Sequence, residues 1–373
     1  MEKKKIAFIE LETHSALLEQ WYLLLKEMQS VDFFFFVSPK VKSKITAIPK
    51  DCMTLVQNAK EIESKLAGFD AVVVNTFHRH FEQYQTILEQ KKGLVVLHNL
   101  NFSLFFKSVN LQNIWTEKAR LTYFLKLYFA EKIRSRRKAI LKAVGFGVLS
   151  QSLFDEVNSR SSLAAKTKLI QMNYCQSHSF PASEVINIVM PGNVSGKRKD
   201  IKSLFEVLPK LNPQSKLHFT FLGKPESDEV LKQLEDLKQS CSDKITITHY
   251  HRFIPWEEYS GEIAKSHLLL CPIKNETSFY LVDEIYGKTK VSGSEADCIY
   301  NGKIGLFPTS YPKMNWHNLY YENASDLEAI LNNLTLGQLS SEYEKLQPYL
   351  KQYTFESVKT HLENQLLALA NSK

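Results

Sequence analysis

The stretch YGKTKVSGSEADCIYNGKIGLFP (residues 286–308) combines a basic loop, a short helical run and a buried strand. Ser292 or Ser294 can cap the predicted helix, and Gly302 stands where a glycine often ends one. The free N–H groups and the dipole of a helix N-terminus attract anions. The stretch therefore predicts either an anion-binding turn or an ordinary loop–helix–strand connection, and the surrounding chain has to decide between them.

Short apolar runs alternate with amphipathic segments along the rest of the chain. The runs that predict buried strands are residues 6–9, 31–37, 69–74, 94–97, 145–150, 166–172, 185–190, 217–222, 245–248, 268–272 and 304–307. Continuous apolar strands separated by helices are typical of parallel sheets that helices cover on both faces. We therefore predict an α/β protein with two doubly wound, Rossmann-like domains that face each other across a cleft.

A polar segment without apolar periodicity, NYCQSHSFPASE (residues 173–184), separates the two series of predicted strands. Its composition is typical of a linker, and 373 residues suit two domains of ordinary size. We expect a first domain over residues 1–175 and a second over residues 184–338. C-terminal helices over residues 339–373 are expected to cross back to the first domain.

Composition narrows the class of protein. The net charge of +7 suits anionic ligands or an anionic membrane surface, and no recognised nucleic-acid module accompanies it, so we predict no nucleic-acid partner. The five cysteines lack CxxC spacing, which disfavours structural zinc and a disulfide framework and favours a reducing compartment. We find no secretory signal and no apolar run long enough to span a bilayer. A cytoplasmic protein without a bound metal is expected.

A basic helix is predicted over residues 116–142. Residues 118–142 carry nine Lys or Arg residues and one acid, Glu131, interleaved with apolar side chains. Basic amphipathic helices of this kind bind anionic membrane surfaces. A helix that packs its apolar stripe on its own domain has the same pattern. The segment therefore predicts either a peripheral contact with the inner face of the plasma membrane or an ordinary surface helix.

Polar side chains gather where the predicted strands of the first domain end. They are Glu12 and His14, the run Asn75-Thr76-Phe77-His78, and His98 with Asn99, of which Glu12, His14, Asn75, His98 and Asn99 are the candidate site residues. Ligands of doubly wound sheets bind outside the carboxyl ends of the strands. These residues therefore predict a ligand-binding edge, although a single histidine after a strand is more often structural.

The first strand of the second domain runs into PGNVSGKRKD (residues 191–200), which combines two glycines, a serine and three adjacent cations. Such a loop suits a phosphate or diphosphate, and an arginine can contact it through two N–H groups. The predicted anion contacts of this loop and of the opening stretch are Gly192, Lys197, Arg198, Lys199, Lys290, Ser292, Gly293 and Ser294. Asp297 can accept hydrogen bonds from a ribose diol. Because both loops follow strands of one parallel sheet, we expect them at the same edge.

These features together resemble the GT-B glycosyltransferases, in particular the large retaining group that uses nucleotide diphosphosugars (group 1, family 4-like). The strand ending in PG before Arg198 and Lys199 is similar to the loop where that family contacts the donor diphosphate. VVLHN (residues 95–99) is similar to the strand whose terminal histidine, here His98, approaches the transferred sugar. LLLCPI (residues 268–273) and DCIYNGKIGLFP (residues 297–308) resemble the strands and helix around the donor ribose.

The family has two glutamates separated by seven residues, and this sequence can be aligned with that pair in two registers. Glu276 and Glu284 have the family's spacing, but the sequence after them, IYGKTKV, does not continue its pattern. Asp297 keeps that continuation and puts Thr289 in the first acidic position. We favour the register with Asp297. The family's first glycine-rich loop is also replaced, by Glu12-Thr13-His14.

The resemblance implies transfer of a sugar from a UDP- or GDP-linked donor, without a further cofactor or metal. The acceptor would be a glycan or lipid-linked molecule in surface polysaccharide or glycoconjugate synthesis, held by the first domain. His98, Arg198 and Lys290 would be the catalytic residues, because charge develops on the leaving diphosphate. A non-catalytic GT-B-like binding protein and a GT-B-fold sugar-nucleotide epimerase remain as alternatives.

Overall fold

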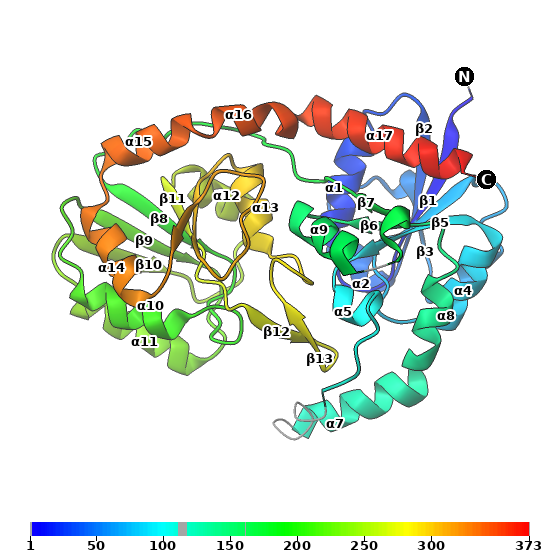
Figure 1. The fold of residues 1–373 in the computed structure, drawn as a ribbon, viewed down its shortest axis with the longest axis horizontal. Coiled ribbons are helices and arrows are strands. Elements are labelled where there is room, and N and C mark those ends of the chain that lie inside the picture. The colour runs from blue at the N-terminus through cyan, green and yellow to red at the C-terminus, as the bar shows by residue number, and fades with distance from the viewer. Residues whose placement is uncertain (1, 111–117, 161, 373) are drawn as a thin grey trace. The chain divides into compact units, whose positions relative to one another are not determined.

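The computed structural model describes residues 2–110, 118–160 and 162–372 (Figure 1). Contacts divide the chain into two compact units. The first unit comprises Met1–Met172, Ser278–Val291 and Phe355–Lys373, and the second comprises Asn173–Thr277 and Ser292–Thr354. The boundary after Met172 coincides with the start of the predicted linker. The predicted division differs from the structure in three segments: residues 173–175 and 339–354 belong to the second unit, and residues 278–291 belong to the first.

The first unit contains a seven-stranded sheet of order β3-β2-β1-β4-β5-β6-β7, in which neighbouring strands are parallel. Its strands are β1 (Lys4–Glu10), β2 (Val31–Val37), β3 (Met53–Leu55), β4 (Ala71–Val74), β5 (Lys92–Leu97), β6 (Gly145–Val148) and β7 (Thr167–Leu169). The chain starts in the middle, winds out to β3, and then winds the other way. Of these strands only β3 was not predicted, and only one of its three residues is buried.

The described helices of the first unit lie between and after these strands. They are α1 (Ser15–Leu25), α2 (Pro39–Lys42), α3 (Lys60–Glu63), α4 (Phe81–Gln90), α5 (Leu100–Ser103), α7 (Lys118–Leu125), α8 (Arg136–Ile140), α9 (Gln151–Arg160) and α17 (Phe355–Asn371), with short turns η1 (Lys50–Cys52), η2 (Lys126–Ala130), η3 (Ile133–Ser135) and η4 (Ala164–Lys166). The last helix, α17, contacts α1 and β1. Its Glu363 accepts a hydrogen bond from the backbone N–H of Ser30 at 2.8 Å, so the C-terminal helix does return to the first unit as predicted.

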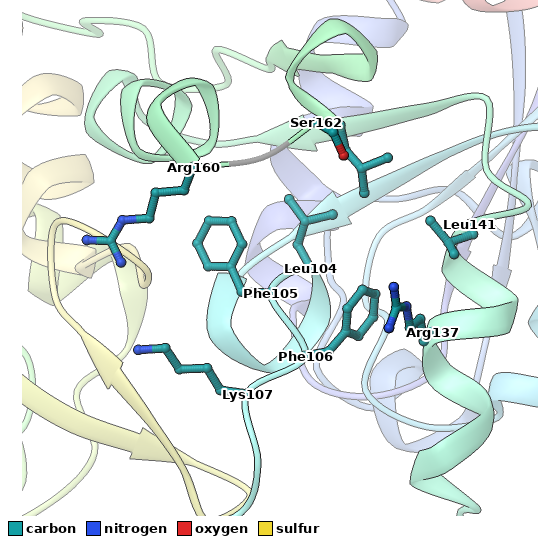
Figure 2. A pocket seen from close by; sticks show the side chains of 9 residues that line it. Leu104, Phe105, Phe106, Lys107, Arg137, Leu141, Arg160 and Ser162 are labelled. Atoms are coloured by element: carbon teal, nitrogen blue, oxygen red, sulfur yellow. The ribbon is translucent and has the colours of Figure 1, made fainter.

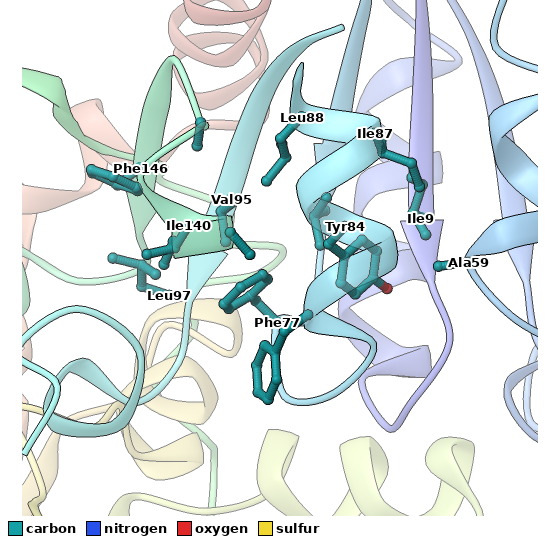
Figure 3. Close-up of a cluster of buried hydrophobic side chains, with 14 of the residues drawn as sticks. Ile9, Ala59, Phe77, Tyr84, Ile87, Leu88, Val95, Leu97, Ile140 and Phe146 are labelled. Atoms are coloured by element: carbon teal, nitrogen blue, oxygen red, sulfur yellow. The ribbon is translucent and has the colours of Figure 1, made fainter. Parts of the chain in front are cut away.

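Alternate residues of β1 face opposite sides of the sheet, as the two-residue period of a strand requires. Phe8 packs on Trp21 of α1, with ring centroids 4.9 Å apart. Ile9 instead joins the buried cluster under α4, which includes Phe77 and Tyr84 (Figure 3). Both faces of the sheet are therefore covered, which explains why its central strands are largely apolar.

The second unit repeats this winding in a parallel sheet of order β10-β9-β8-β11-β14-β15. Its strands are β8 (Ile186–Pro191), β9 (Leu217–Leu222), β10 (Ile245–His249), β11 (Leu268–Leu270), β14 (Gly305–Pro308) and β15 (Leu319–Tyr321). Its helices are α10 (Ile201–Val207), α11 (Asp228–Ser240), α12 (Trp256–Ala264), α13 (Gly293–Tyr300), α14 (Ala324–Asn333), α15 (Leu336–Glu344) and α16 (Gln347–Leu350), with turns η5 (Leu208–Lys210) and η6 (Lys351–Tyr353). The predicted fold class, two doubly wound α/β domains, is confirmed.

A hairpin of β12 (Glu276–Phe279) and β13 (Val282–Ile285) lies outside both sheets and was not predicted. Its turn residues Tyr280 and Leu281 have φ angles of 45° and 68°. Two successive left-handed residues give the twist that a two-residue hairpin turn needs. Val282 is fully buried among apolar side chains of the first unit, which anchors the hairpin there.

The basic segment is not one continuous helix. α7 continues into the π-helical turn η2, and the chain then breaks at Lys132, whose φ of 49° is left-handed. The break lets Leu127, Ile133 and Ile140 join the core of the first unit. Residues 116 and 117, where the predicted helix starts, lie outside the described residues. In the part of the chain that the structure describes, no helix is both long and apolar enough to cross a bilayer.

Candidate functional site

The strand order of the first unit reverses between β1 and β4, and doubly wound sheets bind ligands at such a switch point. Glu10, the last residue of β1, is fully buried there. Its carboxylate accepts hydrogen bonds from Asn75 Nδ2 (2.6 Å), Thr76 Oγ1 (2.5 Å) and the backbone N–H of Glu12 (2.7 Å). Glu10 therefore ties the ends of two strands together. Glu10 was not predicted, because a single acid at the end of an apolar run gives no pattern.

Three histidines gather at this switch point. The rings of His14 and His98 stack with centroids 3.8 Å apart, and His78 meets them edge-on at 5.9 and 6.1 Å. His98 Nε2 lies 2.8 Å from the backbone oxygen of Asn75. Because that oxygen only accepts, Nε2 carries the proton and Nδ1 is an acceptor. Burial lowers the pKa of His98 to about 3 and, with the nearby Lys290, that of His14 to about 4, so both rings are neutral at pH 7.

Glu12 is also buried at this edge. Its carboxylate lies 3.7 Å from Arg79 Nη1 and 3.5 Å from His80 Nε2. Arg79 Nε donates a hydrogen bond to the Tyr280 hydroxyl of the hairpin at 3.0 Å. Arg79 and His80 were not part of the predicted polar cluster. They belong to the same run after β4 as Asn75, NTFHRH (residues 75–80), so extending that polar cluster would have found them.

The hairpin brings Lys290 to this cluster of the first unit. Lys290 forms a backbone bridge with Asn99, and its ammonium lies 5.2 Å from the centre of the Phe279 ring. Glu284 accepts hydrogen bonds from the backbone N–H groups of Phe102 (2.9 Å) and Asn101 (3.3 Å) at the start of α5. Burial raises the pKa of Glu284 to about 7. Lys290 therefore shares a unit with the predicted acceptor-side residues, whereas the other predicted donor contacts lie in the second unit.

The second unit reverses its strand order between β8 and β11. The loop after β8 starts at Gly192, whose φ is 73°, and ends at Lys199. The buried ammonium of Lys199 donates to the carbonyl oxygens of Pro191 (2.5 Å), Gly192 (2.9 Å) and Asn193 (2.9 Å), and burial lowers its pKa to about 8. Lys199 thus holds the loop together, whereas Lys197 and Arg198 are exposed.

Further contacts fix this loop against the segments that follow β9 and β11. Glu226 accepts hydrogen bonds from Ser195 Oγ (2.5 Å) and the backbone N–H of Gly196 (2.9 Å). The backbone N–H of Asp200 donates to the carbonyl of Pro272 at 2.7 Å. The glycine loop therefore lies at the switch point, where the sequence predicts the anion site. Glu226, some thirty residues away in the chain, could not be recognised from the loop sequence.

Helix α13 begins as predicted. Ser292 is its N-cap and accepts a hydrogen bond from the backbone N–H of Ser294 at 3.3 Å, while Gly293 is exposed. The half-buried Asp297 accepts a hydrogen bond from the Tyr259 hydroxyl at 2.9 Å. Burial raises its pKa to about 6, and the charge of Lys199 opposes that rise. Asp297 is therefore within electrostatic range of the glycine loop.

Glu295, two residues before Asp297, has a different role. Its carboxylate accepts a hydrogen bond from the buried Tyr311 hydroxyl at 2.9 Å, and burial raises its pKa to about 7. Only 8% of Glu295 is exposed, so it is a core residue. No group of His, Cys, Asp or Glu side chains that could hold a metal ion occurs among the described residues.

The comparisons with known proteins concern the fold. No protein-family model and no curated protein matches the sequence. Anabaena HepE in complex with UDP is similar over 98% of this chain and 100% of that chain, with a TM-score of 0.62 and 11% identity. The lipopolysaccharide outer core galactosyltransferase WaaB is similar over 98% and 99%, with a TM-score of 0.59 and 12% identity. The chain has the GT-B fold.

A third GT-B neighbour is a putative UDP-N-acetylglucosamine 2-epimerase from Listeria monocytogenes, similar over 100% of this chain and 98% of that chain, with a TM-score of 0.58 and 12% identity. At such identities the likeness is one of fold, which hosts several activities. Function has to be argued from the side chains at the two switch points.

Proposed function

We propose that this GT-B protein is a glycosyltransferase that moves a sugar from a UDP- or GDP-linked donor to a glycan or lipid-linked acceptor in surface polysaccharide or glycoconjugate synthesis. The observation that supports it most is the switch point of the second unit. There a glycine loop is fixed against the end of β11, and the half-buried Asp297 lies in electrostatic range of it. Nucleotides bind doubly wound units at this position.

In the proposed donor complex, Asp297 accepts hydrogen bonds from the ribose hydroxyls. Its exposure distinguishes it from the enclosed Glu295. The exposed Lys197 and Arg198 neutralise the diphosphate, and the N–H groups at Gly192 and at the N-terminus of α13 bind its oxygens. Lys199 acts indirectly, because its three donors already hold the loop carbonyls.

The proposed chemistry is a single exchange at the anomeric carbon. The acceptor oxygen forms a bond to that carbon, the bond to the diphosphate oxygen breaks with its electron pair, and the acceptor proton passes to the leaving diphosphate. Arg198 stabilises the charge that develops there, and Lys290 and the neutral His98 contact the transferred sugar, His98 as an acceptor through Nδ1. We assign retention of configuration, and a reaction that uses no metal, from the family resemblance.

Membrane contact is proposed for the basic segment. Leu121, Leu125 and Phe129 are exposed, Phe129 to 77%, and the exposed Lys126 lies among them. Exposed apolar side chains with interspersed cations suit the headgroup region of an anionic leaflet. The protein would then act in the cytoplasm, at the inner face of the plasma membrane.

A thermal-shift screen of the purified protein against UDP, GDP, CMP and their sugars tests the donor site. A ligand that binds only the native state stabilises it, by about 2.7 kcal/mol at a hundredfold excess over Kd. We expect a shift with UDP or GDP that Arg198→Ala abolishes. Lys216→Ala, an exposed change before β9 that also removes one positive charge, should leave the shift intact.

The outcomes separate the proposal from its alternatives. The absence of any nucleotide shift would leave a non-catalytic GT-B-like protein. Conversion of a sugar nucleotide to its epimer without acceptor would identify an epimerase instead. A shift that survives Arg198→Ala would contradict the assigned diphosphate contact.

A further inference from the structure

The first unit has a surface cavity of about 450 Å³ that the proposed donor chemistry does not use (Figure 2). Its lining residues are Leu104, Phe105, Phe106, Lys107, Arg137, Leu141, Arg160, Ser162 and Leu163. Five of these side chains are apolar, three are cationic and, among the lining residues described, none is acidic. The volume falls within the range of about 300 to 1,000 Å³ that is usual for small-molecule sites.

The cations occupy the rim of the cavity. Arg160 and Lys107 extend to the same side with Phe105 between them, and Arg137 lies beside Phe106 (Figure 2). The guanidinium of Arg137 is 5.4 Å from the centre of the Phe106 ring. Arg160 forms an ion pair with Glu156 of its own helix at 2.7 Å. Neither Lys107 nor Arg137 has an ion-pair partner among the described residues, so both charges are available to an anion.

A buried arginine contacts two of the lining residues. Arg136 is 7% exposed, and its guanidinium lies 4.8 Å from the ring centre of Phe102 and 5.9 Å from that of Phe106. Its Nη2 donates to the carbonyl of Lys107 at 3.0 Å, while Nη1 has no hydrogen-bond partner among the described residues. Phe106 also has a strained φ of 52°. Arg136 therefore fixes the lining residues Phe106 and Lys107 in position.

We propose that this cavity binds an anionic amphiphile in which a phosphate adjoins an isoprenoid chain. Lys107 and Arg137 contact the phosphate, with Arg137 able to use two N–H groups. The chain lies on Leu104, Phe105 and Leu141. A free anion would not need the apolar wall, and a neutral lipid would not need the cations. The inference rests on the proposed function, because such a molecule would be the lipid-linked acceptor.

Calorimetric titration of the full-length protein with farnesyl phosphate, below its micellar concentration and without nucleotide, tests the proposal directly. Farnesol and inorganic phosphate are titrated in parallel. We expect farnesyl phosphate to bind at least about tenfold more tightly than either, a difference of about 1.4 kcal/mol. Inorganic phosphate that binds as tightly as farnesyl phosphate would show a plain anion site and overturn the proposal.

A matched pair of double variants locates the site. Lys107→Ala/Arg137→Ala removes two lining cations, and Arg134→Ala/Lys138→Ala removes two exposed cations of the same region that do not line the cavity. The first pair should weaken farnesyl phosphate binding about tenfold or more, and the second less than about twofold. Equal effects would mean that general surface charge attracts the ligand, and the proposal would fail.

Vesicles of phosphatidylglycerol and phosphatidylcholine test whether the cavity binds a single isoprenoid phosphate or the headgroups of a membrane surface. If the cavity takes a single isoprenoid phosphate, saturating farnesyl phosphate should leave vesicle binding largely unchanged, whereas the Arg134→Ala/Lys138→Ala variant should weaken it. Vesicles that displace farnesyl phosphate would assign the cavity to phospholipid headgroups and overturn the isoprenoid proposal. The thermal shift with nucleotide is an independent measurement. Farnesyl phosphate binding without any nucleotide shift would contradict the glycosyltransferase proposal. A nucleotide shift without farnesyl phosphate binding would contradict only the isoprenoid phosphate site.

Discussion

Replacing Glu284 by Gln should change how the stability of the protein depends on pH. Glu284 is 1% exposed, and burial raises its pKa from 4.5 to about 7. Between these two values the native state keeps a proton that the unfolded chain has released. Stability therefore falls as pH rises through this window, and the loss is complete above about pH 7. At about 1.4 kcal/mol per pKa unit, the loss amounts to about 3 kcal/mol.

The glutamine side chain of the variant cannot ionise, so this loss disappears. At pH 5 the substitution should destabilise the protein by about 1 to 3 kcal/mol, because the new amide NH2 group faces one of the two backbone N–H groups that donate to Glu284. At pH 8 the difference in unfolding free energy between wild type and variant should be about 3 kcal/mol smaller than at pH 5, so that it vanishes or changes sign. Urea unfolding at several pH values measures it.

Glu276→Gln is the control, because Glu276 is exposed on the same hairpin. It should change stability by less than about 0.5 kcal/mol at every pH. A difference between wild type and Glu284→Gln that stays constant from pH 5 to pH 8 would refute the reasoning. Glu284 would then be ionised throughout, and the hydrogen bonds from α5 would outweigh its burial.

Three further changes test other parts of the structure. Gly302→Ala should destabilise the protein by about 1 to 3 kcal/mol, because the φ of Gly302 is 59° and the new Cβ would lie 2.3 Å from a backbone oxygen. Gly337→Ala in α15 is the control and should be neutral or stabilising. Urea unfolding compares the two variants. Lys199→Met should lower the free energy of unfolding by about 2 kcal/mol or more in the same assay, since three loop carbonyls lose their donor. The exposed Lys197→Met is the control and should lower it by less than about 0.5 kcal/mol. His98→Ala should preserve the nucleotide thermal shift and slow sugar transfer about tenfold or more, as measured by release of nucleoside diphosphate.

The fold could be predicted because its main signals are local. Val31–Val37 and Leu217–Leu222 are predominantly apolar runs with the predicted bounds, and most of their residues are buried because helices cover both faces of each sheet. Ser292 and Gly302 mark the ends of α13 by chemistry that acts within a few residues. The hairpin could not be predicted in this way, because Val282 is buried by residues more than a hundred positions away.

The candidate site was only partly predictable for the same reason. His14, His98 and Asn75 each follow a predicted strand, and the switch point of a doubly wound sheet brings them together. Glu10 and Glu226 position these loops through hydrogen bonds to residues distant in sequence, so no spacing reveals them. Lys199 likewise has a role that its sequence neighbours, Lys197 and Arg198, do not share, because the fold of the loop turns three carbonyls toward its ammonium.

The carboxylates of the two competing registers have separate environments. Glu284 is enclosed in the first unit, where two backbone N–H groups at the start of α5 occupy it, and it is therefore poorly suited to a ribose. Asp297 keeps exposed surface, lies on α13 and is in electrostatic range of the glycine loop, so it suits that contact. The hairpin supplies a physical reason for the broken pattern: it uses the second glutamate to fix itself to the first unit. We therefore propose that the donor carboxylate comes from α13, as in the Asp297 register.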